Sequence, residues 1–179
     1  MRGLKTYYGY YAAPFAVVGF VGSAEGLIHL GFYRDPEEFV EEVRVRFGEI
    51  PQNIDEFRDL TELLERYFSG RRTELDYPII LNGTEFQLRT WMKVREIPYG
   101  EVRSYEWVAR NIGRRGAARA VGSALRRNPV ALIIPFHRVV RKNGGIGGFR
   151  YGVEIKRRLL RIEGIRLRSF QDLSGLHIP

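Results

Sequence analysis

The chain of 179 residues contains no cysteine. This excludes disulfides and cysteine-ligated zinc sites. The three histidines, His29, His137 and His177, show no metal-ligand spacing, so we expect no metal and no cofactor. Apolar stretches are short as well, and none approaches the roughly 20 residues that a membrane helix needs. We therefore expect a cytoplasmic protein that does not associate with membranes.

Lysine is scarce, with 4 residues against 25 arginines. Residues 1–82 hold 9 basic and 14 acidic side chains, a net charge of −5, whereas residues 83–179 hold 20 and 7, a net charge of +13. Confining positive charge to one half predicts a phosphate-binding surface, although a basic solvated face is the plainer interpretation. Arginine suits bidentate phosphate contacts and thermostable ion networks, so we also expect a thermophilic source.

The first part of the chain predicts an α+β N-terminal domain over residues 1–78. Strands are expected at 6–12, 15–21 and 27–33, because aromatic and β-branched residues lie between turn residues. Asp35, followed by a proline, is expected to start a helix. A second helix is expected to begin near residue 53 and to end at Gly70. The expected buried stripes of the two helices are Phe39, Val40, Val43 and Phe47, and Phe57, Leu60, Leu64 and Tyr67.

Residues 79–179 predict a mostly α C-terminal domain with a helix-turn-helix. Thr84 and Ser104 are expected to cap two helices, and residues 117–127 form a third with two distinct faces. One face of this third helix combines small residues, which allow close approach to another backbone, with arginines, which can reach phosphates. Together with the helix capped by Ser104 it predicts a helix-turn-helix. Tight packing of that face on a neighbouring helix is the alternative. The buried face is Ala117, Ala120, Val121, Ala124 and Leu125, and the other is Arg119, Gly122, Ser123 and Arg126.

The remaining segments complete this second domain. The first helix is expected to bury Leu88, Trp91 and Met92. Residues 130–140 have the pattern of a strand, and residues 143–148 that of a flexible loop. The last helix, 153–163, is expected to bury Ile155, Leu159 and Ile162 and to expose its arginines.

Residues 133–140, Ile-Ile-Pro-Phe-His-Arg-Val-Val, resemble the active-site signature of the O6-alkylguanine-DNA alkyltransferases, or methylated-DNA–protein-cysteine methyltransferases. In that family a cysteine between the proline and the histidine takes the alkyl group from damaged guanine. Phe136 stands at this position. Other segments match the family in order and spacing: Gly83–Gln87, Ile97–Tyr105, Ala118–Gly122, Arg127–Val130, Gly147–Gly152 and Leu159–Gly164.

The resemblance implies roles for the residues around the missing nucleophile. His137 matches the base that acts through a water, Glu163 the residue that orients it, and Asn128 the brace between the helix-turn-helix and the active site. Phenylalanine has no lone pair and cannot accept an alkyl group. A buried core histidine is the plainer interpretation of His137.

The resemblance also implies nucleotide flipping, because the target atom is unreachable inside a stacked duplex. Arg119 matches the arginine that replaces the flipped base, and Tyr105 matches the tyrosine that contacts it. A surface charge and an ordinary helix aromatic are the plainer interpretations. The implied DNA-binding residues are Tyr105, Arg119, Gly122, Ser123 and Arg126, and the implied base pocket is Tyr105, Pro135, Phe136, Val139, Phe149, Arg150 and Tyr151.

The sequence thus predicts a nucleoid-associated DNA-repair protein that binds O6-alkylguanine in double-stranded DNA without transferring the alkyl group. It resembles the alkyltransferase-like proteins in this respect. We expect a monomer that also meets other DNA-repair proteins. Three alternatives remain open: an active methyltransferase whose cysteine was replaced, an inactive DNA-binding or regulatory module, and another chemistry at His137.

Overall fold

The computed structural model describes residues 5–166 and 178–179. The chain separates into two compact units, Met1–Leu81 with Pro129–Ala131, and Asn82–Asn128 with Leu132–Pro179. The first is α+β and the second is mainly helical, as the sequence predicts. The division into domains of residues 1–78 and 79–179 stays a prediction. Within the described ranges, no helix is both long and apolar enough to span a bilayer.

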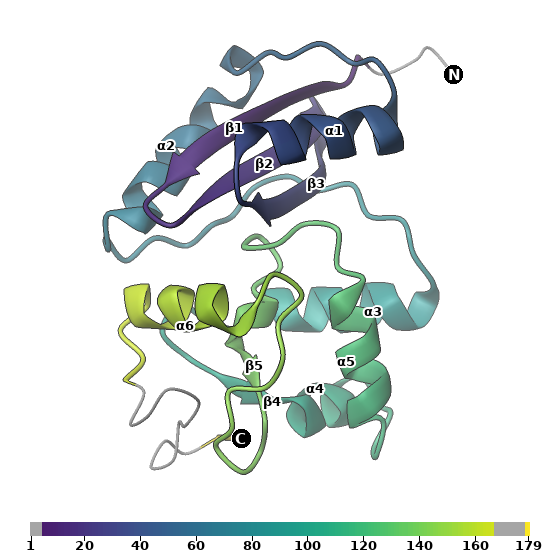
Figure 1. The fold of residues 1–179 in the computed structure, drawn as a ribbon. Coiled ribbons are helices and arrows are strands. Elements are labelled where there is room, and N and C mark those ends of the chain that lie inside the picture. Colours follow the sequence, from purple (N-terminus) through teal and green to yellow (C-terminus); the bar gives the residue numbers. More distant parts are fainter. Residues whose placement is uncertain (1–4, 167–177) are drawn as a thin grey trace. The chain divides into compact units, whose positions relative to one another are not determined.

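A three-stranded antiparallel sheet forms the centre of the first unit (Figure 1), in the order β1 (Tyr7–Ala13), β2 (Ala16–Ser23), β3 (Gly26–Tyr33). Two helices, α1 (Pro36–Phe47) and α2 (Arg58–Phe68), follow it in sequence. Asp35 caps α1 by accepting a hydrogen bond from the Glu38 amide at 2.8 Å. A 3₁₀ turn, Asp55–Phe57, leads into α2.

The central strand β2 is buried on both faces, which explains why its residues are almost uniformly apolar rather than alternating. Val17 and Val21 belong to one cluster with Phe39 of α1. On the opposite face, the Phe20 ring packs edge-on against Phe57, with centroids 5.0 Å apart. The two helical segments therefore cover opposite sides of the sheet.

The outer edge of β3 is paired by two later segments. The Leu27 amide donates to Pro78 O at 2.9 Å, and Ile80 N donates back to Leu27 O at 2.8 Å. Leu30 exchanges the same kind of bonds with Pro129 O and Ala131 N, at 2.9 and 2.8 Å. Residues 129–131 thus belong to the first unit although they follow most of the second in sequence.

The second unit contains α3 (Glu85–Arg95), α4 (Tyr105–Asn111), α5 (Ala118–Arg126) and α6 (Val153–Ile162), with a short parallel pair of strands, β4 (Arg103–Ser104) and β5 (Val139–Val140). The predicted Thr84 cap on α3 is confirmed, where it forms a capping box with Gln87, and so is the Ser104 cap on α4. Trp91 of α3 donates its indole N–H to Ala124 O of α5 at 2.9 Å. This buried bond joins two helices that are far apart in sequence.

Three predictions about buried faces are wrong. Met92 is 46% exposed, and α3 instead buries Thr90, whose hydroxyl is satisfied by donating to Phe86 O at 2.7 Å. Ala120 is exposed, since the buried side of α5 is narrower than predicted. On α6 the fully buried residues are Lys156, Leu159 and Leu160, while Ile155 and Ile162 are half-buried.

The strand predicted across residues 130–140 is also wrong in most of its length. Only Val139–Val140 is a strand of the second unit. Leu132 has a positive φ of 67°, and residues Phe136–Arg138 form a 3₁₀ turn. The segment is apolar because it is buried, not because it is extended.

Candidate base-binding cavity

A cavity of about 710 Å³ opens in the second unit, within the range typical of small-molecule sites. Its lining comes from α4, from the outer face of α5, from the 3₁₀ turn and from the loop that precedes α6. The lining residues are Tyr105, Ala118, Arg119, Gly122, Ser123, Leu125, Arg126, Phe136, Arg141, Gly147, Gly148, Phe149 and Arg150.

Four exposed arginines, Arg119, Arg126, Arg141 and Arg150, lie among these lining residues. The polar groups that the cavity offers are therefore mainly cationic donors. Guanidinium groups bind phosphate oxygens in a bidentate manner and stack on planar rings. The arginine rim can attract a polyanion and can also contact a base.

An aromatic cluster forms the apolar part of the cavity. The Phe136 ring is 5% exposed and stacks on Phe149, with centroids 4.5 Å apart and planes inclined by 27°. Tyr151 packs edge-on against Phe149 at 5.6 Å, outside the cavity lining. The Arg150 guanidinium lies 5.4 Å from the centroid of the Tyr151 ring, a cation–π distance.

Tyr105 stands between two glycines in the cavity wall. A Cβ on Gly122 would lie 3.7 Å from the Tyr105 ring, and a Cβ on Gly147 would lie 3.2 Å from its hydroxyl. Gly147 also has a positive φ of 74°, which favours glycine. Burial raises the pKa of the Tyr105 phenol, so the hydroxyl stays protonated near neutral pH and can donate a hydrogen bond.

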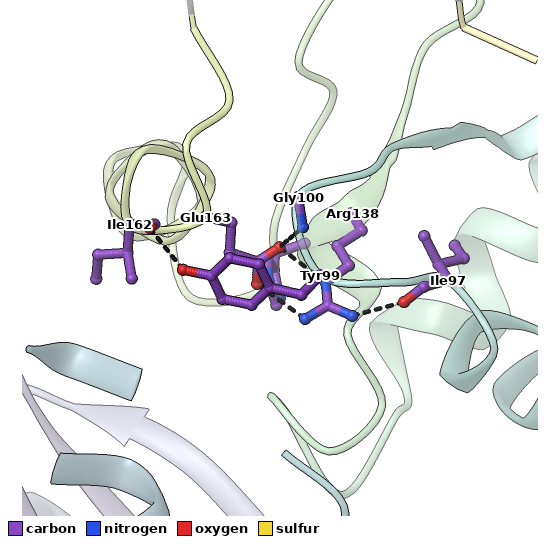
Figure 2. A network of polar contacts seen from close by, with 7 residues as sticks. Ile97, Tyr99, Gly100, Arg138, Ile162 and Glu163 are labelled. Carbon is purple, nitrogen blue, oxygen red and sulfur yellow. Dashed lines mark hydrogen bonds and ion pairs between the residues drawn. The ribbon is translucent and has the colours of Figure 1, made fainter. Parts of the chain in front are cut away.

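Directly after Phe136 the chain enters a buried polar network around Glu163 (Figure 2). His137 Nε2 lies 2.7 Å from one carboxylate oxygen of Glu163. Arg138 binds both oxygens, through Nη2 at 3.0 Å and Nε at 2.9 Å, and the Gly100 amide donates at 3.3 Å. Arg138 also donates to Ile97 O at 2.5 Å. The carboxylate is thus held in a fixed orientation by an amide and two side chains.

The network fixes the protonation of its members. Burial lowers the pKa of His137, although the neighbouring carboxylate opposes this, so the imidazole is neutral near pH 7. Burial alone would raise the pKa of Glu163, but His137 and Arg138 hold it well below its usual range. With its Nε2–H directed at Glu163, the ring has an unprotonated Nδ1. This atom is buried and has no hydrogen-bond partner among the described residues.

Asn128 lies between α5 and the Phe136 segment. It is fully buried, and its side-chain amide donates to Ile134 O at 3.1 Å. The bond reaches across the segment that contains Leu132, whose backbone is in the left-handed region. Asn128 therefore holds the end of α5 at a fixed distance from the turn that carries Phe136.

Comparisons with known proteins match both units. A family profile described as "6-O-methylguanine DNA methyltransferase, ribonuclease-like domain" matches residues 6–81, and one described as "6-O-methylguanine DNA methyltransferase, DNA binding domain" matches residues 85–165. A methylated-DNA–protein-cysteine methyltransferase of Methanosarcina acetivorans is 38% identical over 162 residues, which cover 88% of this chain and 98% of that protein. The chain belongs to this methyltransferase family.

Further similarities agree with this assignment. The methylated-DNA–protein-cysteine methyltransferase of Metallosphaera sedula is 39% identical over 158 residues, covering 88% of this chain and 92% of that protein. A crystal structure of Mycobacterium tuberculosis OGT in complex with DNA superposes with a TM-score of 0.78 at 36% identity, covering 88% of this chain and 92% of that chain. In this methyltransferase-family chain, Phe136 replaces the acceptor cysteine, and no other cysteine exists.

The structure gathers most of the site residues named from the sequence. Tyr105, Phe136, Phe149 and Arg150 line the cavity together with the outer face of α5, namely Arg119, Gly122, Ser123 and Arg126. His137 and Glu163 are in direct contact. Three members of the expected base pocket do not line the cavity: Pro135 and Val139, which are buried, and Tyr151.

Sequence reasoning missed several residues at this site. Arg138 gives Glu163 a permanent cationic partner, and its place within the family motif was the available signal. Arg141 and Gly147 line the cavity from the loop, whose glycines indicated only flexibility. Lys156 is fully buried behind that loop, and nothing in an arginine-rich helix distinguishes it from a surface lysine.

Proposed function

We propose that this protein binds duplex DNA at O6-alkylguanine, holds the extruded nucleotide in the cavity, and does not transfer the alkyl group. The observation that carries this proposal is the position of Phe136. It lies in the lining of a cavity that is otherwise rimmed by arginines, where the family has its acceptor cysteine. The base, the residue that orients it and the cavity remain, but the chain has no thiol.

Several features support DNA as the ligand. The second half of the chain has a net charge of +13, and it matches the family's DNA-binding domain. The Mycobacterium tuberculosis relative was crystallised in complex with DNA. We assign α4 and α5 as a helix-turn-helix whose second helix presents Arg119 and Arg126 to the duplex. This contact supplies most of the affinity through phosphates.

Nucleotide extrusion is proposed for Arg119 and Tyr105. Removing a base from the stack costs a few kcal/mol, and an alkylated base that pairs poorly reduces this cost. Arg119 is exposed in the cavity lining, where its guanidinium can enter the space left in the duplex. Tyr105 lies within the lining and presents a protonated hydroxyl.

The alkyl group stays on the DNA in this proposal. Phe136 offers no nucleophile, and an unactivated ring cannot be made into one by a neighbouring base. The protein would then mark the lesion, in the nucleoid-containing cytoplasm, for another DNA-repair protein. We propose that it acts as a monomer.

A second candidate is a methyltransferase in which the acceptor cysteine has been replaced. Two observations favour it: the relatives match over nearly the whole chain, and His137 and Glu163 keep the contact that a thiolate would need. The two candidates differ in whether phenylalanine or cysteine is the natural residue at position 136. Both predict that the chain with Phe136 binds the lesion and does not transfer the alkyl group.

The experiment that tests the proposal compares two duplexes that differ only by one O6-methylguanine. Binding should be tighter to the lesion, and a radiolabelled methyl group should remain on the DNA. If the three rim arginines other than Arg119 each contact a phosphate, the slope of log K against log salt should be about −2.7, so that affinity falls about fortyfold between 50 and 200 mM salt. Equal affinity for both duplexes or label on the protein would refute the proposal.

A further inference from the structure

Lys156 is a buried amine that forms no ion pair with the described residues. Its side chain is fully buried in α6, and Nζ donates to Val139 O at 2.6 Å and to Gly148 O at 3.4 Å. Among the described residues, no carboxylate lies within ion-pair distance of this amine. Burying an amine is costly unless its N–H groups are hydrogen-bonded, and here two carbonyl oxygens accept from it, a contact that a leucine at this position could not make.

The two hydrogen bonds of Lys156 join the cavity wall formed by Gly147–Phe149 to β5. Gly148 lines the cavity, and Val139 begins β5 on the other side of the amine. A Cβ on Gly147 would lie 3.7 Å from Lys156 Nζ and 3.2 Å from the Tyr105 hydroxyl. The amine and the Tyr105 hydroxyl therefore both lie next to Gly147, on the side from which a side chain at this position would project.

The loop that carries the wall is secured at its two ends by other contacts. At its start, Arg141 N donates to Gly145 O at 2.8 Å, and Ile146 is buried in a cluster with Val140 and Leu160. At its end, Gly152 N donates to Phe149 O at 3.1 Å. The glycines between these anchors have little stiffness of their own, and the Lys156 amine reaches them at Gly148.

We propose that Lys156 is the positioning residue of the base cavity: its amine ties Gly148 to Val139 and so keeps residues Gly147–Phe149 of the cavity lining in place beside Tyr105. The expected effect on discrimination between alkylated and normal guanine rests on the proposed function. The expected effect on the position of residues Gly147–Phe149 does not.

The amine should also give lesion recognition a pH dependence. Burial lowers the pKa of Lys156 to about 7, and the Arg141 charge adds to this effect. Among the other groups facing it, burial lowers the pKa of His137 and raises that of Tyr105, so both shift away from the Lys156 range, and arginine side chains keep their charge. Loss of the ammonium proton weakens both bonds, so the wall should loosen as the pH rises through 7.

The experiment compares Lys156→Met with Lys142→Met. Methionine keeps the length of the side chain and removes the donors, and the exposed Lys142 provides the same loss of charge in the loop that Lys156 contacts. Hydrogen exchange of the DNA-free protein should be at least tenfold faster at Gly147, Gly148 and Phe149 in Lys156→Met and unchanged in Lys142→Met. The preference for the O6-methylguanine duplex should fall at least tenfold in Lys156→Met alone, while affinity for undamaged duplex stays within about twofold.

A third variant covers the case in which Lys156→Met does not fold. In wild type the lesion preference should decline from pH 6 to pH 8, and in Lys156→Arg, which keeps its charge, it should be flat. Unchanged exchange in a folded Lys156→Met, or the same pH profile in wild type and Lys156→Arg, overturns the inference. If wild type shows no lesion preference at any pH, the proposed function fails, and the exchange measurement still decides the role of Lys156.

Discussion

Replacing Phe136 with cysteine should create an alkyltransferase at a measurable cost in stability. The new thiol would lie beside His137, whose unprotonated Nδ1 has no partner among the described residues and whose Nε2 is fixed by Glu163. A neutral imidazole in this position can accept the thiol proton, directly or through a water, and the thiolate is the nucleophile. The sulfur would attack the alkyl carbon, and the guanine O6 would leave with the bonding electrons.

The stability cost follows from the packing of the ring. Truncation of a buried phenylalanine costs about 3–5 kcal/mol, and a stacked aromatic pair contributes about 0.5–1.5 kcal/mol beyond its area. Phe136 lines an open cavity, so the vacated space can be hydrated, and cysteine retains one heavy atom beyond Cβ. We expect a loss of about 2–3 kcal/mol in the free energy of unfolding, or a Tm lower by about 4–12 °C for a chain of this length.

Mass spectrometry after incubation with an O6-methylguanine duplex measures the transfer of the methyl group to the protein. Phe136→Cys should carry one added methyl group on residue 136. Phe136→Ala, which opens a similar space without sulfur, should bind the duplex and carry none. Adding His137→Gln to Phe136→Cys should slow transfer by about a hundredfold or more, because the base is removed. If Phe136→Cys folds, binds the lesion and remains unmodified after long incubation, the surrounding residues are not a working active site.

Three further predictions follow from the same geometry. Arg119→Ala should abolish the lesion-dependent fluorescence of a base analogue at the target position while Arg126→Ala retains it; extrusion as efficient as in wild type would remove Arg119 from the mechanism. Glu163→Gln should cost about 3–5 kcal/mol in the free energy of urea unfolding, because the Arg138 charge would stay buried without its carboxylate. The matched change Glu154→Gln, at a half-exposed residue of α6, should change stability by less than about 0.5 kcal/mol. The pKa of His137 is lower in the folded chain than in the unfolded one, so protons bind preferentially to the unfolded chain. The free energy of unfolding should therefore fall by up to about 1.4 kcal/mol per pH unit below pH 6.5. His137→Gln should show a shallower decline, and a slope identical to that of wild type would contradict the neutral imidazole.

Local structure was the most predictable part of this molecule. Asp35, Thr84 and Ser104 act as caps where their sequence neighbours indicated, because a cap depends on residues within one helical turn. The strands of the first unit were predicted within about two residues, a common error at element ends. Positions at the border of a buried face were less predictable, as Met92 and Ala120 show, since helix periodicity fixes a direction and not the width of the contact.

The site was predictable where the family motif names residues and unpredictable where the contacts are non-local. His137 and Glu163 came from the motif, and the structure brings them together. Lys156 could not be recognised, because the two carbonyl oxygens that accept its hydrogen bonds lie 8 and 17 residues away in sequence, and every residue has a backbone carbonyl. Val139 was expected in the pocket by analogy, but its carbonyl accepts the bond from Lys156.

The pairing of Leu30 with residues 129–131 has a consequence for synthesis. A growing chain exposes the β3 backbone at Leu30 until about one hundred further residues have left the ribosome. An unpaired strand edge is a template for association with other chains. During that interval the first unit has its sheet and helices but lacks the last part of its edge. A chain cut after residue 81 would keep this defect permanently, so aggregation of the isolated N-terminal fragment, relieved by supplying a peptide of residues 127–133, is the expected behaviour.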